Sequence, residues 1–205
     1  MKIATVILIT LLALFNRCER PPVKQDIPPH GNPAEHTGVR HDEMQSSPGA
    51  ADAPYELQFL DTMIVHHQGA IEMAQLVATR AQHPELKRLA KSIVAEQQKE
   101  IGQLKDWRQK WFGDAGQAVN MDLPGMSEGM NEMNLDRLDE LKENEFDLEF
   151  IRQMIPHHEG AVTMAKDLMT HDPRAELRTL AENIINTQQS EINQMREWEK
   201  EWGKE

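Results

Sequence analysis

A Met-x-x-His-His segment occurs twice in the sequence, and its residues are the ones best suited to chemistry. The copies consist of Met63, His66 and His67 in the first half of the chain and Met154, His157 and His158 in the second. Residues three and four positions apart lie on one face of an α-helix, so the thioether and the two imidazoles of each copy can converge. Neutral imidazole is a common metal ligand. The spacing therefore favours a metal site in each half of the chain.

The two segments are part of a longer duplication. A shift of 91 residues aligns residues 55–111 with residues 146–202 without a gap, and 23 of the 57 aligned pairs are identical. A second shared segment, Gln-Gln-x-Glu-Ile, starts at Gln97 and returns at Gln188. A period of this length that occurs only twice indicates a duplicated supersecondary unit and not a solenoid, which needs more copies.

Each repeat is expected to fold as two antiparallel helices. The first helix should begin near Pro54 and the second at Pro84, because proline is favoured in the first turn of a helix. In both helices, apolar and small residues recur at alternating spacings of four and three, as they do in antiparallel bundles. In the second copy, Asp172 is the expected cap of the second helix.

The two hairpins predict an all-α fold. Four apolar stripes are buried most simply in a four-helix bundle, in which residues 54–112 form the first hairpin and residues 145–205 the second. Residues 113–144 connect the hairpins as a Met-rich crossover, with a short helix expected at about residues 135–142. Residues 54–205 are thus expected to form one domain.

Polar residues interrupt the apolar stripes of both hairpins. Folding the first hairpin about residues 82–83 brings His66 level with residue 99, because each helix rises about 1.5 Å per residue. We therefore expect His66 to face Gln97 and Glu100, and the second copy to repeat this arrangement. Two arrangements satisfy such buried groups: a closed hydrogen-bond network that sets the register of the helices, or a bound metal ion.

The candidate ligands combine soft and hard donors. Thioether with imidazole favours copper, above all Cu(I), whereas carboxylate with imidazole suits zinc, iron or Cu(II). Four methionines crowd the crossover, at positions 121, 126, 130 and 133, and Met195 replaces Leu104 in the second copy, which makes that copy softer. The full set of candidate metal ligands is Met63, His66, His67, Met73, Gln97, Glu100, Met126, Met130, Met154, His157, His158, Met164, Gln188, Glu191 and Met195.

Two other functions are compatible with the same residues. A structural or interaction bundle would use a buried His-Gln-Glu network to fix its register and would bind no metal. A ferritin-like metal-dependent oxidoreductase would need Glu-x-x-His on two helices, and no histidine of this sequence has a glutamate three residues before it. We therefore expect no catalytic activity and a metal ion as the partner.

The first 53 residues are expected to lie outside the domain. Residues 1–18 combine a positive start, an apolar run and Cys18, which is typical of an export signal, either a lipoprotein signal or a plain secretory one. Residues 19–53 are rich in Pro and His and should form a disordered tether. The protein is thus expected in the periplasm or cell envelope, either free or tethered to the membrane through its N-terminus. Its formal charge of -12 disfavours nucleic acid as a partner.

The string Met-Ile-x-His-His-x-Gly-Ala-x-x-Met-Ala, followed by Gln-x-x-Glu-Ile and Trp-x-x-x-Trp, resembles the bacterial family known as domain of unknown function 305. The similarity covers about residues 54–203. It implies an exported, ferritin-like four-helix bundle, similar in some members to periplasmic copper-binding proteins that use Met and His ligands. Carried over by position, that role falls on Met63, His66, His67, Met73, Met154, His157, His158 and Met164.

Overall fold

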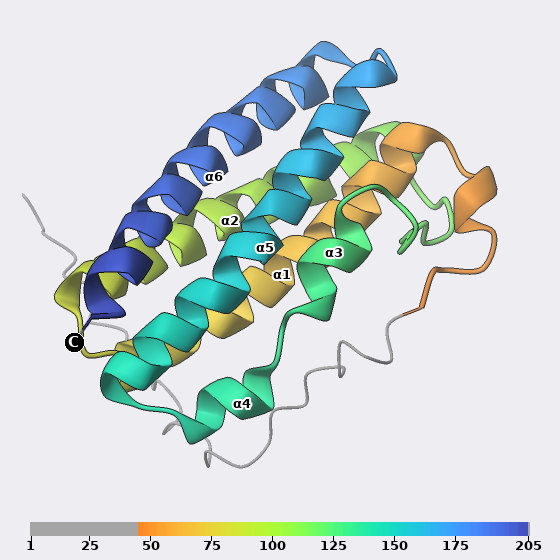
Figure 1. Cartoon of the computed structure of the whole chain (residues 1–205). Helices are drawn as coiled ribbons and strands as arrows, with labels where there is room; N and C mark the ends of the chain where they lie inside the picture. Colours follow the sequence, from red (N-terminus) through yellow and green to blue (C-terminus); the bar gives the residue numbers. More distant parts are fainter. Residues whose placement is uncertain (1–44, 205) are drawn as a thin grey trace, which may run out of the picture. The chain divides into compact units, whose positions relative to one another are not determined.

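Four long helices make up most of the protein (Figure 1). The computed structural model describes residues 45–204, and these contain helices and no strand. The all-α four-helix bundle expected from the repeat is therefore confirmed. The long helices are α1 (Tyr55–Arg80), α2 (Pro84–Phe112), α5 (Glu143–Thr170) and α6 (Ala175–Trp202), and the short ones are η2 (Ala50–Asp52), α3 (Met126–Asn131) and α4 (Leu135–Glu140).

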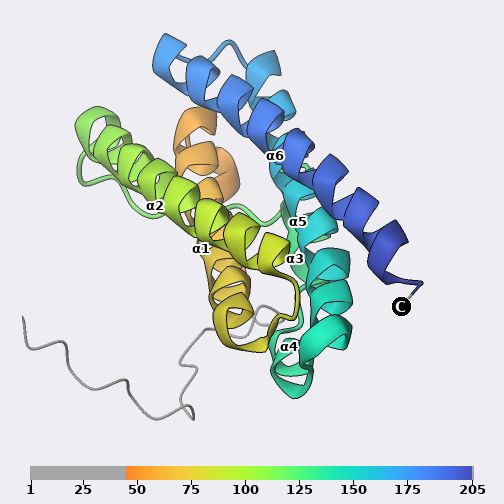
Figure 2. The ribbon, with the colours of Figure 1, turned by 90° about the vertical axis from the view of Figure 1, so that its left-hand side faces the viewer.

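The helices pair as the duplication predicts. α1 packs against α2 in one hairpin, α5 packs against α6 in the other, and α1 and α5 join the hairpins along their lengths. Figures 1 and 2 show α1 and α5 running in opposite directions, with α2 and α6 on one side of this central pair. The short helix α3 lies over α1 and α5 on the other side (Figure 1).

The central helices α1 and α5 bury more than one face, because each contacts its own hairpin partner, the other hairpin and the crossover. Their sequences reflect this position, since buried residues follow one another almost continuously from Leu57 to Met63 and from Phe150 to Ile155. α2 and α6 instead bury a single stripe and expose a charged face. One contiguous core results, in which Phe59, Phe146 and Phe150 are the largest fully buried side chains.

Each hairpin turn is held by an acidic residue of the other hairpin. The Asp147 carboxylate accepts hydrogen bonds from the backbone N–H groups of Gln82 and His83 and from His83 Nδ1. The His83 ring stacks on Trp202, with 3.8 Å between ring centroids and 3° between the planes.

The other turn repeats this contact with different residues, because the 91-residue shift converts Asp147, His83 and Trp202 into Glu56, Arg174 and Trp111. Glu56 accepts from the Arg174 N–H at 2.8 Å, and the Arg174 guanidinium lies 4.8 Å from the centre of the Trp111 ring. Reciprocal contacts of this kind are the mark of a two-fold relation. The hairpins are therefore related by an approximate two-fold axis.

Three local expectations need correction. Residues 45–53, expected to belong to the tether, pack on the bundle: Ala50 is buried, and the Ser47 N–H donates to the Val119 carbonyl. The second hairpin begins at Glu143, two residues early. α6 begins at Ala175 without a side-chain cap, because the Asp172 carboxylate pairs with Arg178 instead.

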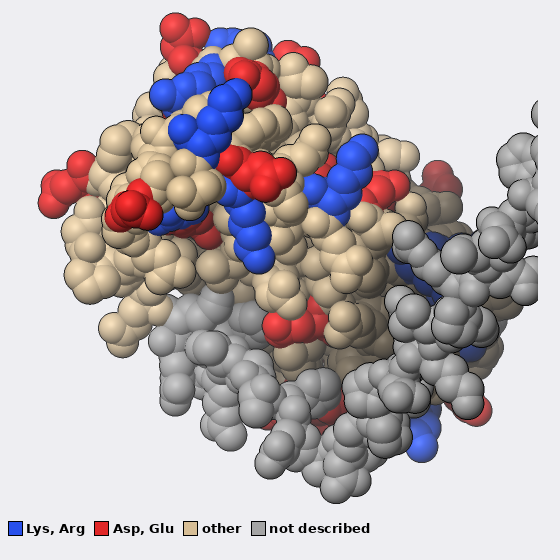
Figure 3. Space-filling model, turned by 180° about the vertical axis from the view of Figure 1, so that it is seen from behind, with Lys and Arg blue, Asp and Glu red and all other residues tan. Residues whose placement is uncertain are grey.

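Other expectations are confirmed. α2 begins at Pro84, and a short crossover helix spans Leu135–Glu140. The export signal, Cys18 and the tether histidines lie outside the described residues. No helix among residues 45–204 is long and apolar enough to cross a membrane. On the face drawn in Figure 3, acidic and basic side chains are interspersed and form no continuous basic patch.

Candidate metal centre

The crossing of α1 and α5 brings His66 and His157 together. Their ring centroids are 3.9 Å apart, their planes differ by 42°, and both side chains are fully buried. They are equivalent residues of the two repeats, so the approximate two-fold axis passes between them. Burial, followed by the nearby His67 and His158, lowers the pKa of His66 well below its ordinary value of 6.5. The imidazole of His66 is therefore neutral at pH 7, the form that binds metals.

The second histidine of each segment, and not the first, faces the glutamate. The His67 ring lies 2.7 Å from the Glu100 carboxylate, and the His158 ring lies 2.9 Å from that of Glu191. The expectation that His66 faces Glu100 is therefore wrong by one residue. Successive residues of a helix point about 100° apart, so His67 turns toward its own hairpin partner while His66 turns toward the other hairpin.

The helix α3 covers the His66–His157 pair. An ideal Cβ on Gly129 would lie only 2.6 Å from His66 Nε2, which means that the α3 backbone passes directly over this imidazole. An ideal Cβ on Gly69 would lie 3.0 Å from Met133 Sδ and 3.3 Å from His157 Nε2. The Met133 sulfur therefore lies in the immediate neighbourhood of the second imidazole.

Met133 is absent from the candidate ligands proposed from the sequence. It follows α3 in the crossover, where the methionine cluster was noted but only Met126 and Met130 were retained. The sequence contained one usable signal, namely that Met133 is the fourth methionine within 13 residues. Its position relative to α1 and α5 depends on how the crossover folds back, which no local spacing predicts.

The other candidate methionines are all buried in the core. Their fractional exposures are 0–2%, and they belong to the same cluster as the aliphatic and aromatic core residues. Burial of this kind also follows from simple packing, because methionine fills irregular gaps well. These residues are Met63, Met73, Met126, Met130, Met154, Met164 and Met195.

Histidine, cysteine and carboxylate side chains alone do not form a metal-binding cluster in the described part of the chain. Within residues 45–204, no three His, Cys, Asp or Glu side chains converge closely enough to hold a metal ion. Both ring nitrogens of His66 are buried without a hydrogen-bond partner among these residues. Two imidazoles with a neighbouring thioether remain, a soft donor set of the kind that suits Cu(I).

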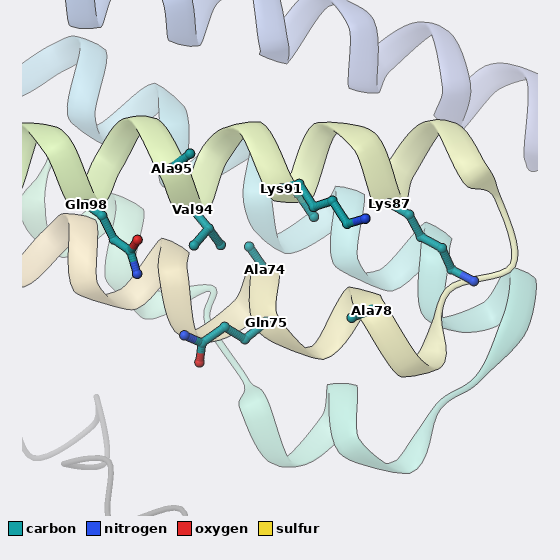
Figure 4. A pocket seen from close by; sticks show the side chains of 9 residues that line it. Ala74, Gln75, Ala78, Lys87, Lys91, Val94, Ala95 and Gln98 are labelled. Carbon is teal, nitrogen blue, oxygen red and sulfur yellow. The ribbon is translucent and has the colours of Figure 1, made fainter. Parts of the chain in front are cut away.

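Away from the two histidines, a hollow of about 420 Å³ lies on the outer surface between α1 and α2 (Figure 4). Alanine and valine side chains form most of its wall, and Lys87 and Lys91 extend along it. The second hairpin has Met169 and Ile185 at the positions of Ala78 and Val94, so its equivalent surface carries larger side chains. A hollow with two ammonium groups and no carboxylate is unsuited to a cation.

The lowered pKa of His66 predicts a dependence of stability on pH. Below pH 6.5 the unfolded chain binds a proton at this residue that the folded, metal-free protein does not bind. Stability should therefore fall as the pH decreases from 6.5 toward the folded-state pKa, by up to about 1.4 kcal/mol per pH unit. Urea unfolding at pH 7.0 and 5.5 should show a smaller loss for His66→Leu than for wild type. Equal losses would contradict the assignment.

The chain matches one protein-family model and is similar to several solved structures. Residues 56–199 match the family model of the domain of unknown function DUF305. CopM in its Cu(II)-bound form is 43% identical, with 72% of this chain and 97% of that chain covered and a TM-score of 0.63. CopM in its Cu(I)-bound form is 41% identical, with 72% and 96% covered and a TM-score of 0.61.

Two further proteins are similar to this chain, one in structure and one in a shorter stretch of sequence. A DUF305 protein from Streptomyces coelicolor is 29% identical, with 73% of this chain and 94% of that chain covered and a TM-score of 0.63. The uncharacterised protein L153 of Acanthamoeba polyphaga mimivirus is 47% identical over 51 residues, or 24% of this chain. The matched part spans 32% of L153, about a third of its length.

Proposed function

The chain belongs to the DUF305 family, and from this membership and the site's geometry we propose that it is a copper-binding protein without catalytic activity of its own. The observation that carries the proposal is the buried His66–His157 pair with Met133 beside it. A neutral, buried imidazole without a hydrogen-bond partner is an unfavourable arrangement unless something binds it. A metal ion held by both rings would remove this cost.

Similarity to CopM supports copper as the metal. That protein has been observed in Cu(I)-bound, Cu(II)-bound and Ag-bound forms. At 41–43% identity over almost all of the CopM chain, the likeness extends beyond the fold. The donor set at the α1–α5 crossing favours Cu(I) over Cu(II), because thioether sulfur is a soft ligand. Copper storage or tolerance outside the cytoplasm fits the export signal expected in residues 1–18.

One observation favours the alternative of a metal-free structural bundle. His67 and His158 already have carboxylate partners, Glu100 and Glu191, so these two histidines need no metal to be satisfied. Such buried pairs can serve mainly to fix the register of helices. The alternative, however, leaves His66 without a role.

Titration with Cu(I) against a competing chelator tests the proposal. Wild type should bind tightly, and His66→Ala/His157→Ala should bind at least about 100-fold more weakly, since both imidazole ligands are lost. Met133→Leu conserves volume and should stay folded, yet should weaken Cu(I) binding by about 10-fold through loss of the sulfur.

The matched control is His171→Ala. His171 is a partly exposed histidine whose side chain is 43% exposed and stacks on Tyr55, away from the α1–α5 crossing. Its removal should leave Cu(I) affinity unchanged. The proposal fails if the His66/His157 variant, shown by circular dichroism to be folded, binds Cu(I) as tightly as wild type.

A further inference from the structure

A second polar site lies between α2 and α6, on the side of the bundle opposite α3. A small cavity of about 10 Å³ opens there. Each lining residue on α2 has its repeat equivalent on α6, so the cavity lies on the approximate two-fold axis that passes between His66 and His157. The lining residues are Ile93, Glu96, Gln97 and Glu100 of α2, and Ile184, Thr187, Gln188 and Glu191 of α6.

Two buried side-chain amides line the cavity, and their oxygen atoms lack hydrogen-bond donors among the described residues. Gln97 and Gln188 are each only 3% exposed, and the Oε1 atom of each is buried without a hydrogen-bond partner among the described residues. A buried carbonyl oxygen without a donor is costly, and such groups in folded proteins are normally satisfied. Because the same atom is unpartnered in both repeats, the arrangement calls for a shared partner on the axis.

Two carboxylates complete the lining. One oxygen of Glu100 accepts from His67 and one oxygen of Glu191 accepts from His158, at 2.7 and 2.9 Å. Histidines that donate to a carboxylate in this way orient it and fix its position. The remaining carboxylate oxygens belong to residues that line the cavity, together with the two amide oxygens.

We propose that this cavity is a binding site for a hard divalent cation, held by the amide oxygens of Gln97 and Gln188 and the carboxylates of Glu100 and Glu191. Oxygen-only ligand sets suit Mg²⁺, Ca²⁺ and Mn²⁺ and disfavour Cu(I). A cavity of about 10 Å³ accommodates one ion or one water molecule. Four of the ligands expected from the sequence, Gln97, Glu100, Gln188 and Glu191, thus line this second site, whereas His66 and His157 lie beneath α3.

Such a cation would join the two hairpins. α2 and α6 each pack mainly on their own hairpin partner, and the cavity lies where residues at the middle of both helices meet. Because a cation bound there contacts both hairpins only in the folded state, it must stabilise the protein against unfolding. The inference is independent of the proposed copper binding, since the two sites share no ligand.

Manganese is the most informative probe, because bound Mn²⁺ is distinguished from free Mn²⁺ by its electron paramagnetic resonance signal. Full-length protein free of metal should bind one Mn²⁺ and unfold at a higher temperature in its presence. Gln97→Leu/Gln188→Leu should lose both effects and keep its Cu(I) affinity. A double variant of the exposed neighbours, Gln98→Leu/Gln189→Leu, is the matched control and should behave as wild type.

A second variant tests whether binding survives when the two amide oxygens are replaced by carboxylate oxygens. Gln97→Glu/Gln188→Glu keeps the oxygen ligands and adds charge, so Mn²⁺ should bind at least as tightly as in wild type. The inference is overturned if wild type shows no bound Mn²⁺, since the cavity then holds only water, or if the leucine variant binds Mn²⁺ with wild-type affinity. Loss of Cu(I) binding in the His66/Met133 variants with Mn²⁺ binding intact would show that the two sites are separate.

Discussion

Replacing Gly160 with alanine is expected to destabilise the protein by about 3 kcal/mol and to weaken copper binding as well. A Cβ at this position would lie 2.3 Å from the Gly125 carbonyl oxygen and 2.9 Å from the Gly129 Cα. Both are backbone atoms, which cannot move aside as the end of a flexible side chain can. Overpacking a close contact costs about 1–3 kcal/mol even where side chains yield, so this contact lies at the upper end.

Copper binding should weaken because Met133 follows α3 and lies beside His157. The methyl group must push α3 away from α5, and Met133, which directly follows this segment, moves with it. The sulfur beside His157 is then displaced, so Cu(I) affinity should fall by about 10-fold, as in Met133→Leu. Urea unfolding and Cu(I) competition on the same preparation measure both effects.

Gly102 provides a matched control, since it is a helical glycine in α2 with no atom within 4 Å of an added Cβ. Gly102→Ala should stabilise the protein by about 0.5–1 kcal/mol, because alanine restricts the unfolded chain and favours the helix. Its copper affinity should match wild type. A Gly160→Ala protein with unchanged stability would contradict the close packing of α3 on α5.

The repeat predicts the four-helix bundle because hydrophobic periodicity and the first-turn prolines are local signals. Pro84 at the start of α2 and the short crossover helix near Leu135 both follow from the chain itself. α3 was not predicted. It contains only six residues, Met126–Asn131, two of which are methionine and one glycine, and its position depends on the long-range Gly125–Gly160 contact. Such a contact leaves no periodic trace in the sequence.

The sequence predicted which segments of the hairpins face each other, but in each repeat it assigned the wrong one of two adjacent histidines to the glutamate. Measuring along the hairpin correctly placed the Met-x-x-His-His segment opposite Glu100. A single apolar stripe cannot, however, describe a helix that is buried on several sides, as α1 is. Of two adjacent buried histidines, His66 and His67, only the packing of the second hairpin decides which faces α2. That packing also brings Met133 to the site.

The approximate two-fold axis relates both groups of buried polar residues. Along it lie α3, the His66–His157 pair, and the Gln97–Gln188 pair between α2 and α6. Both pairs consist of equivalent residues from the two repeats: the His66 and His157 rings are adjacent, and Gln97 and Gln188 line the same cavity. Duplication therefore provides two copies of each candidate ligand, which is how a chain with few carboxylates in its core can supply enough ligands for the two proposed sites.

Asp147→Ala is expected to be the most destabilising substitution at the ends of the bundle, at about 3–5 kcal/mol. The Asp147 side chain is fully buried and accepts hydrogen bonds from the backbone of Gln82 and from both the backbone and the ring of His83. Truncation removes the acceptor of these part-buried donors, one of which, His83, stacks on Trp202. A hydrogen-bonding group that loses its partner costs about 1–3 kcal/mol, and Asp147 serves three such groups.

The equivalent residue of the other repeat provides the control, because its contact is more exposed. Glu56 and Arg174 have side chains that are 20% and 44% exposed, so water can replace the lost partner in Glu56→Ala. That variant should lose no more than about 1 kcal/mol. Urea unfolding followed by circular dichroism avoids the fluorescence of Trp202, which stacks on His83. If Asp147→Ala and Glu56→Ala lost the same free energy of unfolding, burial would not determine the cost of the truncation. The two ends of the bundle would then be energetically equivalent despite their different residues.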